Sequence, residues 1–349
     1  MSAACILGCR GLELMAEERA FFAELRPWGF ILFKRNIDSP EQVRRLTDSF
    51  RELLGRDDVP VLIDQEGGRV QRMGPPHWPK YPSGRAYGQV AVHDPLTRRE
   101  LTRLGARLMA HDLHSVGINV DCVPVLDVPQ PGAHAIVGDR AYGDDADTIA
   151  VLGRAAAEGL IAGGVLPVIK HIPGHGRAFA DSHHDLPVVD ASRSELSALD
   201  FAPFRAVSDM PMGMTAHVVY TAVDRKRPGT ASRKVIRDVI RRELGFDGLL
   251  MTDDLSMKAL TGGFTERAEA ALAAGCDVVL HCNGDMAEMT AVAKGVGKLR
   301  GAAKRRAQAA LARLARTPEP LDEPAARARF AAAFTPGALA TPEGPRVGE

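Results

Sequence analysis

The stretch Gly248 to Asp254, GLLMTDD, shows the pattern that decides the fold, a short apolar run that ends on polar residues. Runs of this kind recur along the 349 residues, and each is nearly continuous in apolar side chains, as expected of a strand covered on both faces. The eight predicted strands are Ala4 to Cys9, Gly29 to Phe33, Val59 to Gln65, Ile118 to Val128, Val165 to His171, Gly213 to Val218, Gly248 to Asp254 and Asp277 to Cys282.

The segments between these runs have helical periodicity. One helix is predicted from the Ser39-Pro40 pair to Gly55, and another from a Ser232 cap to Gly245, because each begins and ends on the residue types that favour helix termini. Eight strand and helix units over roughly 280 residues match an α/β protein with a (β/α)₈ TIM barrel better than an open, doubly wound sheet. The sequence therefore predicts a single barrel domain.

The last part of the chain departs from this alternation. Met286 to Arg316 is rich in Ala, Lys and Arg and predicts a long helix or a helix pair. We therefore expect the catalytic barrel with its C-terminal helices to occupy residues 1–316. The remaining segment, 317–349, is rich in Pro and Ala with little periodicity, so we expect it to dock loosely or to be partly disordered.

Composition excludes several classes of partner. Lys plus Arg and Asp plus Glu both number 44, so no overall charge attracts nucleic acid or a membrane surface. The N-terminus lacks the pattern of a secretory signal, no apolar run is long enough for a membrane helix, and the five scattered cysteines suit a reducing compartment. We expect a cytoplasmic protein, and a monomer, since a closed barrel needs no partner.

Polar residues end five of the predicted strands, at Asp64-Gln65-Glu66, Asp127, Lys170-His171, His217 and Asp253-Asp254. In a barrel of this type, catalytic groups come from the C-terminal ends of the strands. A polar loop start explains any one of these breaks, but five on the same rim predict an active site there.

The densest polar stretch is KHIPGHGRAFADSHHDLP, from Lys170 to Pro187. Its histidines lack the paired helical spacing of a zinc protease, and Pro173, Gly174 and Gly176 indicate a loop. We therefore expect neither a metal nor a cofactor.

Lys-His-x-Pro-Gly-His-Gly followed by Asp-Ser-His within a short loop resembles the signature of the family 3 glycoside hydrolases. The branch it resembles is that of the bacterial β-N-acetylglucosaminidases that recycle cell-wall fragments. The resemblance extends from Asp64 to Val70, through Gly138 to Gly143, to Met251 to Met257. Ile172 and the Ala141-Tyr142 pair depart from the commonest family pattern. Both changes keep bulk or apolar character, and they affect only the fine contacts around Arg140.

The resemblance implies roles for individual residues. Asp253 is the implied nucleophile, and His183, assisted by Asp181, is the implied acid/base on a mobile loop from Gly174 to Leu186. Because side chains alternate along a strand, we expect Asp254 to anchor the loop and not to share the pocket with Asp253. The implied substrate-binding residues are Asp64, Arg72, Arg140, Lys170 and His171.

The activity that the resemblance implies is exo-acting, retaining hydrolysis through a covalent glycosyl-aspartate. Its substrate is the terminal N-acetylglucosamine of peptidoglycan fragments that contain 1,6-anhydro-N-acetylmuramic acid. Four alternatives stay open: a family 3 β-glucosidase or β-xylosidase, catalysis by the substrate acetamide, a Schiff-base aldolase that uses Lys170, and a non-catalytic sugar-binding barrel.

Overall fold

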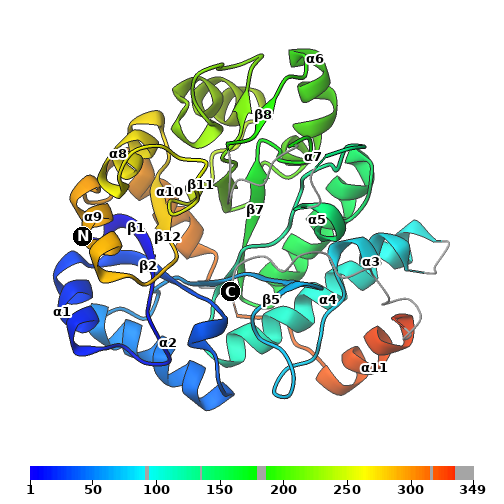
Figure 1. Cartoon of the computed structure of the whole chain (residues 1–349). Coiled ribbons are helices and arrows are strands. Elements are labelled where there is room, and N and C mark those ends of the chain that lie inside the picture. The colour runs from blue at the N-terminus through cyan, green and yellow to red at the C-terminus, as the bar shows by residue number, and fades with distance from the viewer. Residues whose placement is uncertain (91–93, 134–135, 179–185, 315–316, 335–349) are drawn as a thin grey trace.

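A computed structural model describes residues 1–90, 94–133, 136–178, 186–314 and 317–334. Eight parallel strands form a closed barrel, in the order β1-β12-β11-β9-β7-β6-β3-β2, with helices around the outside (Figure 1). Each predicted apolar run overlaps one of them, so the barrel prediction is confirmed. The barrel strands are β1 (Ala3–Gly8), β2 (Pro27–Leu32), β3 (Val61–Ile63), β6 (Val120–Asp121), β7 (Leu166–Ile172), β9 (Met212–Thr215), β11 (Leu249–Asp254) and β12 (Val278–His281).

Strand β6 is much shorter than the predicted run from Ile118 to Val128. Pro124 follows closely and has no backbone N–H, so the regular ladder cannot continue through it. Two small sheets lie outside the barrel, one antiparallel and one parallel. They are formed by β4 (Gln65–Gly67) with β5 (Val70–Gln71), and by β8 (Val188–Val189) with β10 (Val219–Tyr220).

The helices follow the predicted boundary signals. Ser39 Oγ accepts a hydrogen bond from the Gln42 amide at the start of α2, and Gly55 ends that helix with a φ of 62°. The longer helices are α1 (Ala16–Leu25), α2 (Pro40–Leu54), α4 (Pro95–Ser115), α5 (Ala146–Ala162), η5 (Val235–Glu243), α8 (Phe264–Ala274), α9 (Met286–Gly295), α10 (Gly301–Ala312) and α11 (Glu323–Ala333). The short ones are η1 (Lys34–Asn36), α3 (Gly84–Gln89), η2 (Gly138–Arg140), α6 (Arg193–Glu195), η3 (Leu196–Asp200), α7 (Ala202–Ala206) and η4 (Gly229–Ala231).

The barrel strands are buried on both faces. One apolar cluster fills the barrel interior and includes Ile6, Leu62 and Met212, while a larger one lies between the strands and the surrounding helices. This double burial explains why the strands are nearly continuous in apolar residues. The same packing fixes the strand ends, from which the polar residues of the rim project.

The end of the chain contains more structure than expected. The predicted helix pair over Met286 to Arg316 is present as α9 and α10. The segment 317–349, expected to be loose, contains α11, which packs on α4 (Figure 1). Arg327 Nη2 of this helix lies 2.6 Å from Asp112 Oδ1, and Phe334, which follows the helix, is buried. These specific contacts hold α11 in place, although the weak periodicity of its sequence does not predict a helix.

Among the described residues, no helix combines the length and apolar character needed to cross a membrane.

Candidate active site

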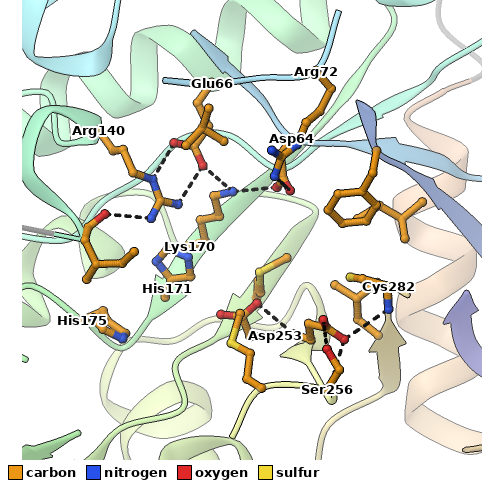
Figure 2. Close-up of a pocket in the computed structure, with 18 of the residues that line it drawn as sticks. Asp64, Glu66, Arg72, Arg140, Lys170, His171, His175, Asp253, Ser256 and Cys282 are labelled. Carbon is orange, nitrogen blue, oxygen red and sulfur yellow. Dashed lines mark hydrogen bonds and ion pairs between the residues drawn. The ribbon is translucent and has the colours of Figure 1, made fainter. Parts of the chain in front are cut away.

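Six predicted site residues from five segments of the chain line one pocket at the C-terminal ends of the barrel strands (Figure 2). They are Asp64, Arg72, Arg140, Lys170, His171 and Asp253. Asp181 and His183, the predicted acid/base pair, lie outside the described residues, as does most of the predicted mobile loop. The barrel therefore brings together the predicted nucleophile and all five predicted substrate-binding residues.

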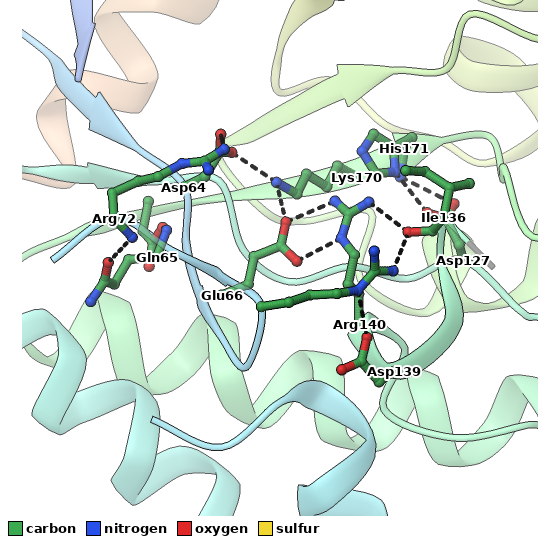
Figure 3. Close-up of polar contacts among 12 residues, drawn as sticks. Asp64, Gln65, Glu66, Arg72, Asp127, Ile136, Asp139, Arg140, Lys170 and His171 are labelled. Atoms are coloured by element: carbon green, nitrogen blue, oxygen red, sulfur yellow. Dashed lines mark hydrogen bonds and ion pairs between the residues drawn. The ribbon is translucent and has the colours of Figure 1, made fainter. Parts of the chain in front are cut away.

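One side of the pocket is a network of charged residues, all buried except the half-buried Asp64. We call it the binding wall: Asp64, Glu66, Arg72, Arg140 and Lys170 (Figure 3). Lys170 Nζ lies 3.0 Å from Asp64 Oδ1 and 2.7 Å from Glu66 Oε1. Arg140 donates two hydrogen bonds of 2.8 Å to the Glu66 carboxylate, and Arg72 Nη2 lies 3.1 Å from Asp64 Oδ2. Each charge thus has an opposite charge within contact distance.

These contacts keep the binding wall ionised. Burial by itself would raise the pKa values of Asp64 and Glu66, but attraction to the neighbouring cations outweighs burial and lowers both, that of Glu66 to about 2. For Lys170, burial favours the neutral amine, yet Asp64 and Glu66 together raise its pKa above the usual range. The wall therefore presents fixed charged donors and acceptors to a ligand.

Asp127, in the segment that follows β6, orients His171. Its Oδ2 lies 2.7 Å from Nδ1 of His171, and its Oδ1 accepts the backbone amides of His171 and His175. Burial tends to raise the pKa of Asp127, but the two histidines lower it to about 2. With Nδ1 engaged by Asp127, the opposite nitrogen of the His171 ring is left for a ligand in the pocket.

Asp253 reaches the pocket from the end of β11 and is 8% exposed. Its Oδ1 accepts a 2.8 Å hydrogen bond from the backbone amide of Asp254. The Asp254 carboxylate accepts the amides of Ser256 and Cys282, and the hydroxyl of Ser256. As predicted, Asp254 anchors the loop, although the expectation that it faces away from the pocket is wrong.

Both aspartates line the pocket because strand alternation breaks down at this point. The register between β11 and β12 shifts between Met251 and Asp254. An irregularity of this kind re-aims a side chain that would otherwise alternate to the opposite face. The two carboxylates nevertheless have different hydrogen-bond partners, which keeps their roles distinct.

Sequence reasoning missed Glu66 and Asp127 as site residues. Both are polar residues at predicted strand ends, and this position is the signal that the sequence offers. Their importance comes from partners far along the chain, since Glu66 binds Arg140 across 74 positions and Asp127 binds His171 across 44. Within the described part of the chain, no three His, Cys, Asp or Glu residues are grouped as a metal site.

Comparison with known proteins gives the class of this barrel. A family model described as the glycosyl hydrolase family 3 N terminal domain matches residues 10–317. The chain therefore belongs to glycosyl hydrolase family 3.

Its relatives narrow the class further. A β-hexosaminidase of Alkalilimnicola ehrlichii is 40% identical over 282 residues, which are 80% of each chain. A β-hexosaminidase of Pseudomonas aeruginosa is 38% identical over 286 residues, covering 81% of this chain and 83% of the relative. The chain is thus a family 3 glycoside hydrolase homologous to β-hexosaminidases.

Solved structures agree with this assignment. NagZ from Neisseria gonorrhoeae in complex with N-trifluoroacetyl-D-glucosamine superposes with a TM-score of 0.80 at 31% identity, covering 97% of this chain and 95% of NagZ. A family 3 β-N-acetylglucosaminidase from Paenibacillus sp. gives 0.78 at 32% identity, covering 99% of this chain and 64% of that enzyme. The likeness extends over almost the whole chain and so includes the rim that carries the pocket.

Proposed function

We propose that this protein is an exo-acting, retaining β-N-acetylglucosaminidase that removes terminal N-acetylglucosamine from peptidoglycan fragments during cell-wall recycling. The observation that carries the proposal is the position of the Asp253 carboxylate in the pocket whose other side is the binding wall. That wall supplies the fixed donors and acceptors that recognise sugar hydroxyls. The N-acylated glucosamine bound to gonococcal NagZ supports the choice of sugar.

In the proposed first step, Asp253 attacks the anomeric carbon while the bond to the leaving oxygen breaks. His183 gives its proton to that oxygen, and a covalent glycosyl-aspartate results. In the second step, His183 takes a proton from water, and the water oxygen displaces Asp253 from the anomeric carbon. A histidine suits both steps because it titrates near neutral pH, and Asp181 would stabilise its protonated form.

The binding wall would position the sugar for this attack. Asp64 can accept hydrogen bonds from hydroxyls, while Arg72, Arg140 and Lys170 can donate to hydroxyl or acetamido oxygens. All of these groups are already held by one another, so little side-chain ordering is left to occur on binding. A rigid wall of this kind favours one orientation of the sugar above Asp253.

The aldolase alternative conflicts with the state of Lys170. A Schiff-base lysine needs a neutral amine, which enzymes obtain by lowering its pKa. Here Lys170 lies between two carboxylates that raise its pKa, so the amine is held protonated. The surroundings of Lys170 therefore favour a binding role.

The proposed setting is the cytoplasm, where anhydro-muropeptides would be the substrates. All five cysteines are free and buried, as expected of a protein in a reducing compartment.

The decisive assay compares hydrolysis of the 4-nitrophenyl β-glycosides of N-acetylglucosamine and glucose. The Asp253→Ala variant is the negative control, called the blank, because it lacks the proposed nucleophile. We expect the N-acetylglucosaminide to be hydrolysed with the larger kcat/KM and the blank to be inactive on both sugars. Preference for the glucoside would replace this proposal by the β-glucosidase alternative. Hydrolysis of neither sugar would favour the non-catalytic barrel.

A further inference from the structure

His217, which follows β9, is one of the polar strand-end residues that the proposed function leaves without a role. Its side chain is fully buried behind the end of β11. One ring nitrogen, Nε2, lies 3.0 Å from the backbone oxygen of Asp254, and the other, Nδ1, lies 2.7 Å from Thr230 Oγ1. The ring therefore connects the strand that carries Asp253 to η4.

The hydrogen-bond partners fix which nitrogen of the ring carries the proton. A backbone carbonyl only accepts, so Nε2 must be protonated and donate to Asp254. Thr230 can then donate its hydroxyl proton to Nδ1, which at 2.7 Å is nearer than its other acceptor, the Ala216 carbonyl at 3.2 Å. The Thr230 oxygen can accept from Thr215, 2.7 Å away. Burial lowers the pKa of His217 and so favours this uncharged tautomer.

The residue that His217 holds is also the residue that orients the proposed nucleophile. Asp254 donates its amide to Asp253 Oδ1, while its own carboxylate is held by Ser256 and Cys282. The carbonyl is the remaining polar group of Asp254. It accepts from His217 Nε2 at 3.0 Å and from the Met257 amide at 3.3 Å. The register between β11 and β12 shifts at this point, so the regular hydrogen bonds of a sheet do not hold the amide and carbonyl of Asp254. The contacts described above hold them instead.

We infer that His217 is a positioning residue, which holds the peptide of Asp254 and through it the carboxylate of Asp253 in the geometry for attack. This inference rests on the proposed function, because it takes Asp253 as the nucleophile. His217 itself would touch no substrate. Its loss should therefore lower kcat while leaving sugar binding nearly unchanged, since a small displacement of a reacting group lowers the rate far more than the affinity.

Two substitutions of the same residue test this. In His217→Gln the side-chain amide reaches the position of Nε2 and can still donate to Asp254, whereas in His217→Asn it reaches only the position of Nδ1. We expect His217→Asn to lower kcat by about 30-fold with KM changed by less than about two-fold, and His217→Gln to recover most of that loss. Thermal unfolding and calorimetric binding of N-acetylglucosamine check that both variants keep the fold and the binding wall.

Thr230→Val and Thr230→Ser extend the test to the tautomer. Valine keeps the shape but removes the hydroxyl that satisfies Nδ1, so we expect a loss of kcat smaller than that of His217→Asn. Serine keeps the hydroxyl and should retain activity. The serine variant also controls for repacking near η4.

The outcomes separate the two claims. If the wild-type protein is active and His217→Asn keeps full kcat, or loses activity only through KM, the role of His217 is refuted while the proposed function stands. If His217→Gln and His217→Asn lose kcat equally, the contact with Asp254 is not what matters, and the inference is again refuted. If the wild-type protein hydrolyses neither nitrophenyl glycoside, the proposed function fails first and this inference fails with it.

Discussion

On the β3 and β7 side of the pocket, guanidinium and ammonium groups hold the buried carboxylate of Glu66. On the β11 side, backbone amides hold the carboxylate of Asp254, and the uncharged imidazole of His217 holds its backbone oxygen. The first arrangement lowers the pKa values of its acids and keeps them ionised. On the β11 side, the backbone amide of Asp254 orients the Asp253 carboxylate. Because this donor is neutral, it withdraws less negative charge from the carboxylate than a cation would. We propose that the first side binds the sugar and that the second side reacts with it.

Replacing the two aspartates of β11 separately gives the largest expected effect. Asp253→Ala should lower kcat by about 10⁴-fold, since it removes the nucleophile. Asp254→Asn should cost only about 10- to 100-fold, because it loosens the loop that orients Asp253. Steady-state kinetics with thermal unfolding checks both variants, and equal losses would contradict the division of roles between the two residues.

The predicted acid/base, His183, lies outside the described residues, so only an assay can test its role. With a poor leaving group, His183→Ala should lower kcat/KM by about 10²- to 10³-fold, while with 4-nitrophenol the loss should be much smaller, because that alcohol leaves without a proton. The measurement is a comparison of the two substrates on wild-type and variant enzyme. The same loss on both would exclude His183 as the acid.

Glu66→Gln tests the binding wall. It removes the charge between Arg140 and Lys170, so we expect kcat/KM to fall about ten-fold, mainly through KM, because the wall binds substrate and transition state alike. Unfolding in urea should show a loss of about 3 kcal/mol, as breaking a buried ion pair leaves uncompensated charge. The matched control is Glu24→Gln at an exposed position of α1, which should change neither quantity. A fall in kcat with KM unchanged would instead give Glu66 a role in the chemical step.

The last prediction concerns the stability of the protein at low pH and involves no change in activity at neutral pH. Asp64, Glu66 and Asp127 have lower pKa values in the folded state than in the unfolded chain. Their contribution to stability is therefore fully present above the unfolded values of about 4 and is lost as the pH falls toward about 2. Urea unfolding at several pH values should show stability decreasing below pH 5, with a weaker decrease in Glu66→Gln. Identical pH dependence in the two proteins would show that Glu66 is not held in its ionised form.

Local sequence patterns were enough for the fold. The eight apolar runs, the Ser39 and Gly55 helix ends and the polar strand ends all depend on near neighbours, and the structure contains each of them. Helix α11 was missed because its position depends on contacts such as Arg327 with Asp112, which join residues 215 positions apart.

The candidate site was predicted unevenly for the same reason. A family motif could indicate Asp64, Lys170 and Asp253, but the motif does not show that Glu66 bridges Lys170 and Arg140, or that His217 holds Asp254. Those functions exist only once distant strand ends are brought to one rim. Asp254 was misplaced because strand alternation was assumed to continue through an irregular strand end.

We propose that Asp253 reacts covalently at a strand end, opposite a binding wall that only binds the sugar. The most direct test is to incubate the protein with an activated fluorinated N-acetylglucosaminide, digest it and locate the label by mass spectrometry. We expect one glycosyl group on the peptide that contains Asp253, and none in Asp253→Ala. Turnover without any label on Asp253, or a label on another residue, would contradict it.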